Sequence, residues 1–75
     1  MKAIKSIFVN RKTIEGMCKN MPSIKAYPYY KYDRGGDFYL CYICIRIGYR
    51  EYFSPSPYST MEDTGRYIDR LNKRL

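Results

Sequence analysis

Residues 24–53, IKAYPYYKYDRGGDFYLCYICIRIGYREYF, decide the fold of this chain. The first part alternates in side-chain type with a period of two, as Ile24 and Ala26 are separated by Lys25 and followed by Tyr27. That period is typical of a β-strand. Pro28 has no backbone N–H to donate to a neighbouring strand, so the sequence predicts that this strand lies at the edge of a sheet.

Two further strands follow within the same stretch. Residues 33–36 (DRGG) predict a turn, because glycine tolerates positive φ and aspartate bonds its own backbone. Residues 37–47 are apolar on both faces, which is typical of a central strand. Gly48 then predicts a tight second hairpin into a strand over residues 49–53. In this arrangement Tyr30 pairs with Tyr39, and Tyr52 pairs with Ile43.

One helix is predicted before the strands in the sequence and a second helix after them. Residues 11–20 carry apolar side chains at helical spacing, with Asn10 as a candidate N-cap and Pro22 beyond the end. A second helix is expected after Ser59, which opens a capping-box pattern completed by Glu62. Its apolar stripe includes Met61, Ile68 and Leu75. Residues 2–9 fit either a helix or a strand, and as a strand they could cover the edge beside Pro28.

We therefore expect one α+β domain over residues 1–75. It contains a three- or four-stranded antiparallel sheet with one or two packed helices. The element order is α-β-β-β-α, with an extra strand at the N-terminus as an alternative. A chain of 75 residues supports one modest hydrophobic core.

The strand alternation gives the predicted sheet two different faces. Ala26, Ile43 and Ile45 fall on an aliphatic face, which fits beneath the final helix. Tyrosines and cations gather on the opposite face, as a surface that stacks on bases and neutralises phosphates requires. Two alternatives involve the same face. In one, the helix over residues 11–20 packs against this face, and in the other, this face associates with a second copy of the chain in a homodimer.

Composition points to an anionic partner and away from catalysis. The chain has ten tyrosines, and its 14 Lys and Arg residues against seven Asp and Glu give a net charge of +7. Histidine is absent, which removes the commonest general base and metal ligand, so we expect no enzyme activity and no cofactor. Cys41 and Cys44 would point to opposite faces of one strand, which disfavours a metal site.

The sequence also leads us to expect a cytoplasmic protein. Its first residues show no signal peptide, and no apolar run reaches the length of a membrane span. The three cysteines are then expected as reduced thiols.

Basic residues outside the strands are further candidates for contact with an anionic partner. Arg34 lies at the tip of the first hairpin, where it could contact a phosphate or a groove. In the final helix Arg70 is spaced four residues from both Arg66 and Arg74, and this repulsion favours an anionic partner. The candidate residues for binding nucleic acid or another partner are Lys25, Tyr27, Tyr29, Lys31, Arg34, Tyr42, Arg46, Tyr49, Arg66, Arg70, Lys73 and Arg74.

The order helix, three strands, helix resembles that of double-stranded-RNA-binding domains, although residues 54–60 lack their basic loop. Residues 32–75 are similar in order to the small sheet-plus-helix domains that precede phage and transposon integrases. That resemblance implies DNA contacts through the sheet face at Tyr27, Tyr29, Tyr42 and Arg46. The first hypothesis is non-catalytic binding to DNA or RNA. The alternative is a phage or mobile-element accessory protein that inhibits a host protein or nucleoprotein complex through the same tyrosines.

Overall fold

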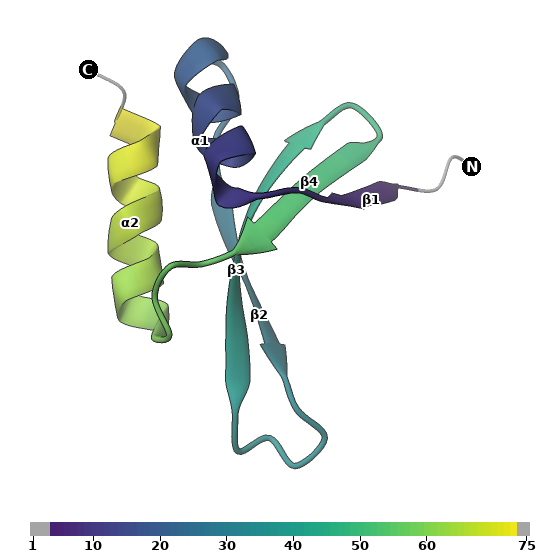
Figure 1. Ribbon diagram of the computed structural model, residues 1–75, viewed down its shortest axis with the longest axis vertical. Helices are drawn as coiled ribbons and strands as arrows, with labels where there is room; N and C mark the ends of the chain where they lie inside the picture. The colour runs from purple at the N-terminus through teal and green to yellow at the C-terminus, as the bar shows by residue number, and fades with distance from the viewer. Residues whose placement is uncertain (1–3, 74–75) are drawn as a thin grey trace.

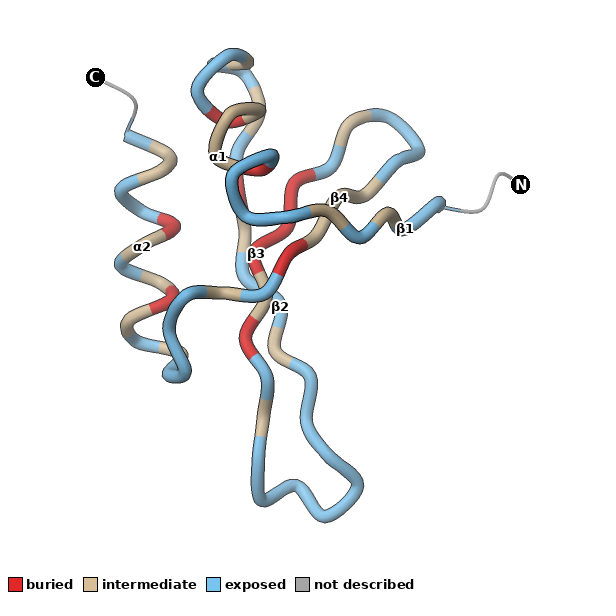
Figure 2. The backbone as a smooth tube through the Cα atoms, viewed as in Figure 1, coloured by how far each residue is buried: buried red, intermediate tan, exposed pale blue. Residues whose placement is uncertain are grey.

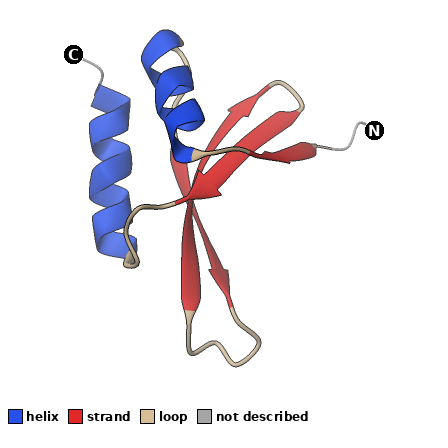
Figure 3. Ribbon diagram, in the orientation of Figure 1, coloured by secondary structure: helices blue, strands red, loops and turns tan. Residues whose placement is uncertain are grey.

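A computed structural model describes residues 4–73 of the chain as a four-stranded sheet with two helices. The sheet has the strand order β1-β4-β3-β2 (Figure 1, Figure 3). This architecture confirms the α+β class and the presence of an N-terminal strand. In chain order the elements are β1 (Lys5–Phe8), α1 (Arg11–Asn20), β2 (Tyr27–Tyr32), β3 (Tyr39–Ile47), β4 (Arg50–Pro55) and α2 (Met61–Lys73).

The sheet is mixed, and the prediction of a purely antiparallel sheet was wrong for β1. β2, β3 and β4 pair antiparallel, whereas β1 runs parallel to β4 with Ile7 beside Tyr52. The Lys5 N–H donates to the Tyr49 carbonyl (2.8 Å) and the Val9 N–H to the Phe53 carbonyl (2.9 Å). β1 therefore occupies the free side of β4, and β2 with its Pro28 remains an edge strand, as predicted.

Both hairpins are two residues out of the predicted register. Tyr30 pairs with Cys41, and Tyr52 pairs with Ile45. The first loop is wider than a four-residue turn, since the Asp33 N–H bonds the Phe38 carbonyl (2.9 Å). The second turn holds two residues, and its Gly48 takes a φ of +60°. Because the shift is even, each side chain stays on its predicted face.

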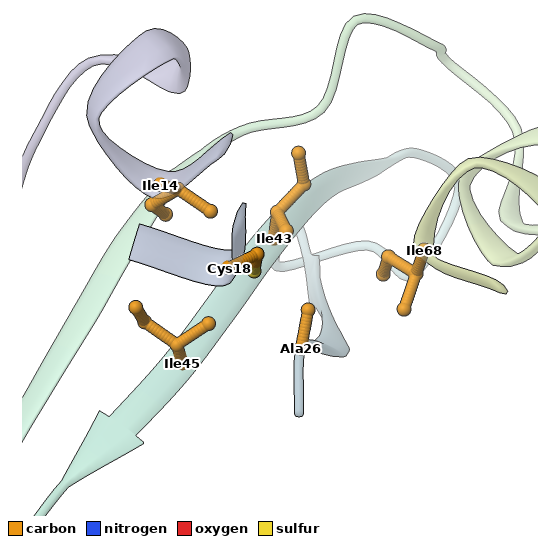
Figure 4. Packing of buried hydrophobic residues seen from close by; sticks show 6 residues of the cluster. All are labelled: Ile14, Cys18, Ala26, Ile43, Ile45 and Ile68. Carbon is orange, nitrogen blue, oxygen red and sulfur yellow. The ribbon is translucent and has the colours of Figure 1, made fainter. Parts of the chain in front are cut away.

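Both helices pack on one face of the sheet and form a single core (Figure 4). α1 contributes Ile14 and Cys18 to this core, and α2 contributes Ile68. Ile43 and Ile45 of β3 lie beneath them with no exposed surface. In Figure 1 both helices lie at the upper left, whereas the β2–β3 hairpin extends downward beyond them. The prediction of an aliphatic core face is confirmed, and the alternative that α1 occupies the tyrosine face is wrong.

The helix N-termini follow capping chemistry, with one correction. The Asn10 side chain accepts a hydrogen bond from the Thr13 N–H (2.9 Å), which confirms the predicted cap of α1. At α2 the capping residue is Thr60 rather than Ser59, since the Asp63 N–H donates to the Thr60 hydroxyl (3.2 Å). The predicted stripe position Leu75 lies outside the described residues.

Polar contacts fix the helices to each other and to β2. The Tyr67 hydroxyl of α2 donates to the Glu15 carboxylate of α1. The Asn72 amide bonds both backbone groups of Ala26, accepting from its N–H (2.8 Å) and donating to its carbonyl (3.0 Å). These contacts hold α1 and α2 on the same side. Within residues 4–73, neither helix has the length and apolar character that crossing a membrane requires.

The core assignment can be tested on β3 with two substitutions. Ile43→Val removes one methylene from the buried centre and should lower the free energy of unfolding by about 1 kcal/mol. Leu40→Ala removes more apolar volume, but Leu40 is 61% exposed, so its cost should be below about 0.5 kcal/mol. Urea unfolding of both variants provides the measurement. A larger cost for Leu40→Ala would contradict the assigned faces.

Candidate functional site

The sheet face opposite the helices carries a row of aromatic rings that crosses all four strands. Ring centroids are 4.9 Å apart between Phe8 and Phe53, 6.0 Å between Phe53 and Tyr42, and 6.0 Å between Tyr42 and Tyr29. We call these four residues the aromatic row. Its outer members, Phe8 and Tyr29, are 60% and 52% exposed. The row is thus a continuous apolar surface open to solvent at both ends.

Strand pairing places the row on one face. Phe8 pairs with Phe53 across β1 and β4, and Tyr29 pairs with Tyr42 across β2 and β3. Directly paired residues project from the same side of a sheet, so each pair brings two rings into contact. Ile43 and Ile45 alternate with Tyr42 along β3 and face the helices. In Figure 2 the buried segments lie along the central strands and on both helices, whereas the end of the β2–β3 hairpin is exposed.

A hollow of about 260 Å³ lies beside the aromatic row. We call it the sheet hollow. The strands alone line it, so neither α1 nor α2 closes it. It combines three of the four rings of the row with a carboxylate, a thiol and an amine. Its lining residues are Ser6, Tyr27, Tyr29, Lys31, Tyr42, Cys44, Glu51 and Phe53.

Glu51 is held in the hollow by a tyrosine. The Tyr27 hydroxyl donates a hydrogen bond of 2.5 Å to Oε2 of Glu51. Burial raises the pKa of the Tyr27 hydroxyl above its usual range, and the bond to Glu51 raises that pKa further. Tyr27 therefore remains a donor throughout the neutral range, and it orients the carboxylate.

Cys44 is buried although it lies on the open face. It pairs with Tyr27 on one side and with Phe53 on the other. Burial raises the pKa of the Cys44 thiol to about 12, with a further contribution from the negative charge of Glu51. The thiol is neutral near pH 7 and adds an uncharged surface to the hollow.

Two predicted cations share this face with the rings. Lys31 of β2 lines the sheet hollow, and Arg46 of β3 lies directly opposite Glu51 of β4 in the strand register. Both cationic side chains are exposed. Tyr27, Tyr29 and Tyr42 therefore lie with Lys31 and Arg46 as the sequence predicted. Lys25 lies just before β2, Arg34 in the β2–β3 loop and Tyr49 in the β3–β4 turn, all exposed.

The basic residues of α2 belong to a different surface. Thr64 and Ile68 face the sheet, so Arg66, Arg70 and Lys73 point away from it by helical geometry. Arg66 forms ion pairs with Glu62 and Asp63 within the helix. The structure thus places these cations on a different surface from the tyrosine face. Arg74 lies outside the described residues.

The candidates named from the sequence omitted five residues of the site, which are Ser6, Phe8, Cys44, Glu51 and Phe53. Phe8 and Ser6 enter through β1, whose strand pairing was left open. Glu51 was not among the candidates, although it lies two residues from Phe53 along β4 and therefore on the same face of the sheet. Among residues 4–73, no three histidine, cysteine or acidic side chains are grouped to hold a metal ion. Cys41 and Cys44 are free thiols.

The chemistry of Cys44 gives a test of the hollow. At pH ~8 the folded protein should leave Cys44 unmodified by iodoacetamide, because burial and the raised pKa suppress the thiolate. Unfolding in denaturant should expose it to alkylation at the same pH. Tyr27→Ala uncovers the hollow and should also accelerate the reaction, whereas Tyr32→Ala on the opposite face should not. Peptide mass mapping follows the modification, and rapid alkylation of Cys44 in the folded parent protein would refute the assigned burial.

No family model matches this chain, and no curated protein or solved structure compared with it gives a match. The functional inference therefore depends on the residues and geometry of the open face.

Proposed function

We propose that this protein binds single-stranded nucleic acid, without catalysis, through the face that carries the aromatic row. The observation that supports this proposal is the uncovered row itself, four rings long, with Phe8 and Tyr29 more than half exposed. Exposed rings in such a row cost solvation free energy unless a partner covers them. Nucleobases are flat partners of the appropriate size.

Stacking favours a single strand over a duplex. Bases in a duplex are already stacked on each other, whereas those of a single strand can be splayed onto aromatic side chains. Each base stacked on a protein ring contributes about 1–3 kcal/mol, with little dependence on its identity. Contact with two or three rings of the row would then give useful affinity for either DNA or RNA.

Charge supports the same partner. Lys31 and Arg46 are exposed on the same face as the row, where they can neutralise phosphates of a bound strand. Arg34 in the β2–β3 loop extends the cationic surface beyond the row. The net charge of +7 accelerates encounter with any polyanion.

Protein binding is the second candidate function. Phe38 is 73% exposed and Leu40 is 61% exposed near the end of the β2–β3 hairpin, and such side chains offer nothing to phosphates. Exposed apolar and tyrosine side chains also form the centres of protein interfaces. An accessory protein of a phage or mobile element could use this end of the face to inhibit a host protein.

Two tyrosines of β2 provide a matched test of the stacking proposal. Tyr29 is 52% exposed in the aromatic row, and Tyr32 is 55% exposed on the helix side of the same strand. Tyr29→Ala should weaken binding to oligothymidine by about 1–3 kcal/mol. Tyr32→Ala should change it by less than about 0.5 kcal/mol. Fluorescence anisotropy at low salt gives both values, and equal losses would count against the row as the binding surface.

Salt dependence tests the electrostatic part of the proposal. The logarithm of affinity should fall linearly with the logarithm of salt concentration, with a slope of about −0.7 for each phosphate neutralised on a single strand. Lys31→Ala and Arg46→Ala should each make the slope shallower by about that amount. Lys73→Ala, on the outer side of α2, serves as the control and should leave it unchanged. Failure to retain any single-stranded DNA or RNA at low salt would refute the proposed function and favour the protein-binding candidate.

A further inference from the structure

The sheet hollow contains a negatively charged group at the centre of a surface otherwise suited to stacking. Glu51 lines the hollow together with Tyr27, Tyr42 and Phe53. Its carboxylate repels phosphate, so the backbone of a bound strand is disfavoured at this point. A ligand group that occupies the hollow must instead supply hydrogen-bond donors to Glu51.

We propose that the sheet hollow binds one guanine base of a single strand, with Glu51 as the residue that recognises its Watson–Crick edge. This inference rests on the proposed function and adds base preference to it. The aromatic row supplies affinity for any base, and Glu51 supplies the discrimination between guanine and the other bases.

The size of the hollow fits one base. Its volume of about 260 Å³ exceeds the roughly 150 Å³ of a cavity that accommodates benzene. It lies just below the range of about 300–1,000 Å³ that is usual for sites of whole small molecules. The rings of Tyr29 and Tyr42, 6.0 Å apart, form part of its wall and can contact the face of a base.

The carboxylate is oriented and keeps acceptor capacity for a ligand. Tyr27 donates to Oε2 of Glu51, and a carboxylate has about four acceptor positions on its two oxygens. A tyrosine hydroxyl ordinarily keeps its proton at neutral pH, and burial raises the pKa of the Tyr27 hydroxyl further. The Cys44 thiol beside it is also neutral. Glu51 therefore presents a fixed anionic acceptor to the hollow.

Guanine is the base whose Watson–Crick edge matches such an acceptor. Its N1–H and N2–H₂ groups are adjacent donors that can bond both oxygens of one carboxylate in parallel. Adenine and cytosine each place one amino donor beside a ring nitrogen that accepts, and thymine and uracil flank one donor with two carbonyls. Each of these edges sets an acceptor against Glu51. Lys31, which also lines the hollow, is a donor for the guanine O6 atom.

The test uses oligothymidine of about eight nucleotides in which one central position is guanine, inosine, adenine, cytosine or thymine. Thymine on both sides prevents the guanine from forming quadruplexes. We expect the guanine probe to bind on the order of tenfold more tightly than the thymine probe. Inosine lacks the N2 amino group and should fall between them. Matching ribonucleotide probes should show the same order.

Two variants isolate the role of Glu51. Glu51→Gln replaces one acceptor oxygen by a donor and should lower the ratio of guanine to thymine affinity to about one. This result is expected even if removal of the negative charge strengthens binding of every probe. Tyr27→Phe keeps the ring and the carboxylate but removes the hydrogen bond that orients Glu51, so it should reduce the guanine preference without abolishing it. Circular dichroism verifies that each variant is folded, and the Tyr27→Phe result tests the preference if Glu51→Gln does not fold.

The outcomes separate this inference from the function on which it rests. Equal affinity for all five probes, or a guanine preference that persists in Glu51→Gln, would overturn guanine recognition and leave single-strand binding supported. Absence of binding by every probe would overturn both. A guanine preference that is lost only in Glu51→Gln would establish the assignment.

Discussion

Burial of β3 on one side of the sheet is the constraint on which the rest of this structure depends. Ile43 and Ile45 have no exposed surface, and both helices pack against them. A chain of 75 residues has enough apolar surface for one core of this size. Because α1 and α2 share that core and are joined by the Tyr67–Glu15 hydrogen bond, neither remains to cover the other face. The exposed aromatic row is a consequence of this one-sided packing.

The faces of the strands could be predicted from the sequence, because their period of two survives an even change of register. Both hairpins shifted by two residues, yet Tyr42 and Ile43 kept their predicted sides. Pairing of β1 could not be predicted, since a four-residue strand carries little pattern and its partner β4 lies more than forty residues away in the chain. The spacing of Ile14 and Cys18 predicted the buried side of α1 but contained no information on which face of the sheet it would meet.

The candidate site shows why a count of charges describes it poorly. The cations of α2 dominate the C-terminal sequence, but they point away from the aromatic row, and Arg66 is already paired with Glu62. On the open face Lys31 and Arg46 accompany the Glu51 carboxylate, the four rings of the aromatic row and the ring of Tyr27. Stacking would then supply much of the affinity, phosphate contacts would fix the strand, and the single acceptor in the hollow would select the base.

The most direct test of this account is the position of α1 and α2 relative to the two faces in solution, measured by nuclear Overhauser contacts together with relaxation by a soluble paramagnetic agent. The account predicts contacts from Ile14 and Ile68 to Ile43 and Ile45, and strong paramagnetic relaxation of the ring protons of Phe8 and Tyr29. Contacts between α1 and Tyr42 or Phe53, with those rings protected from the agent, would contradict it.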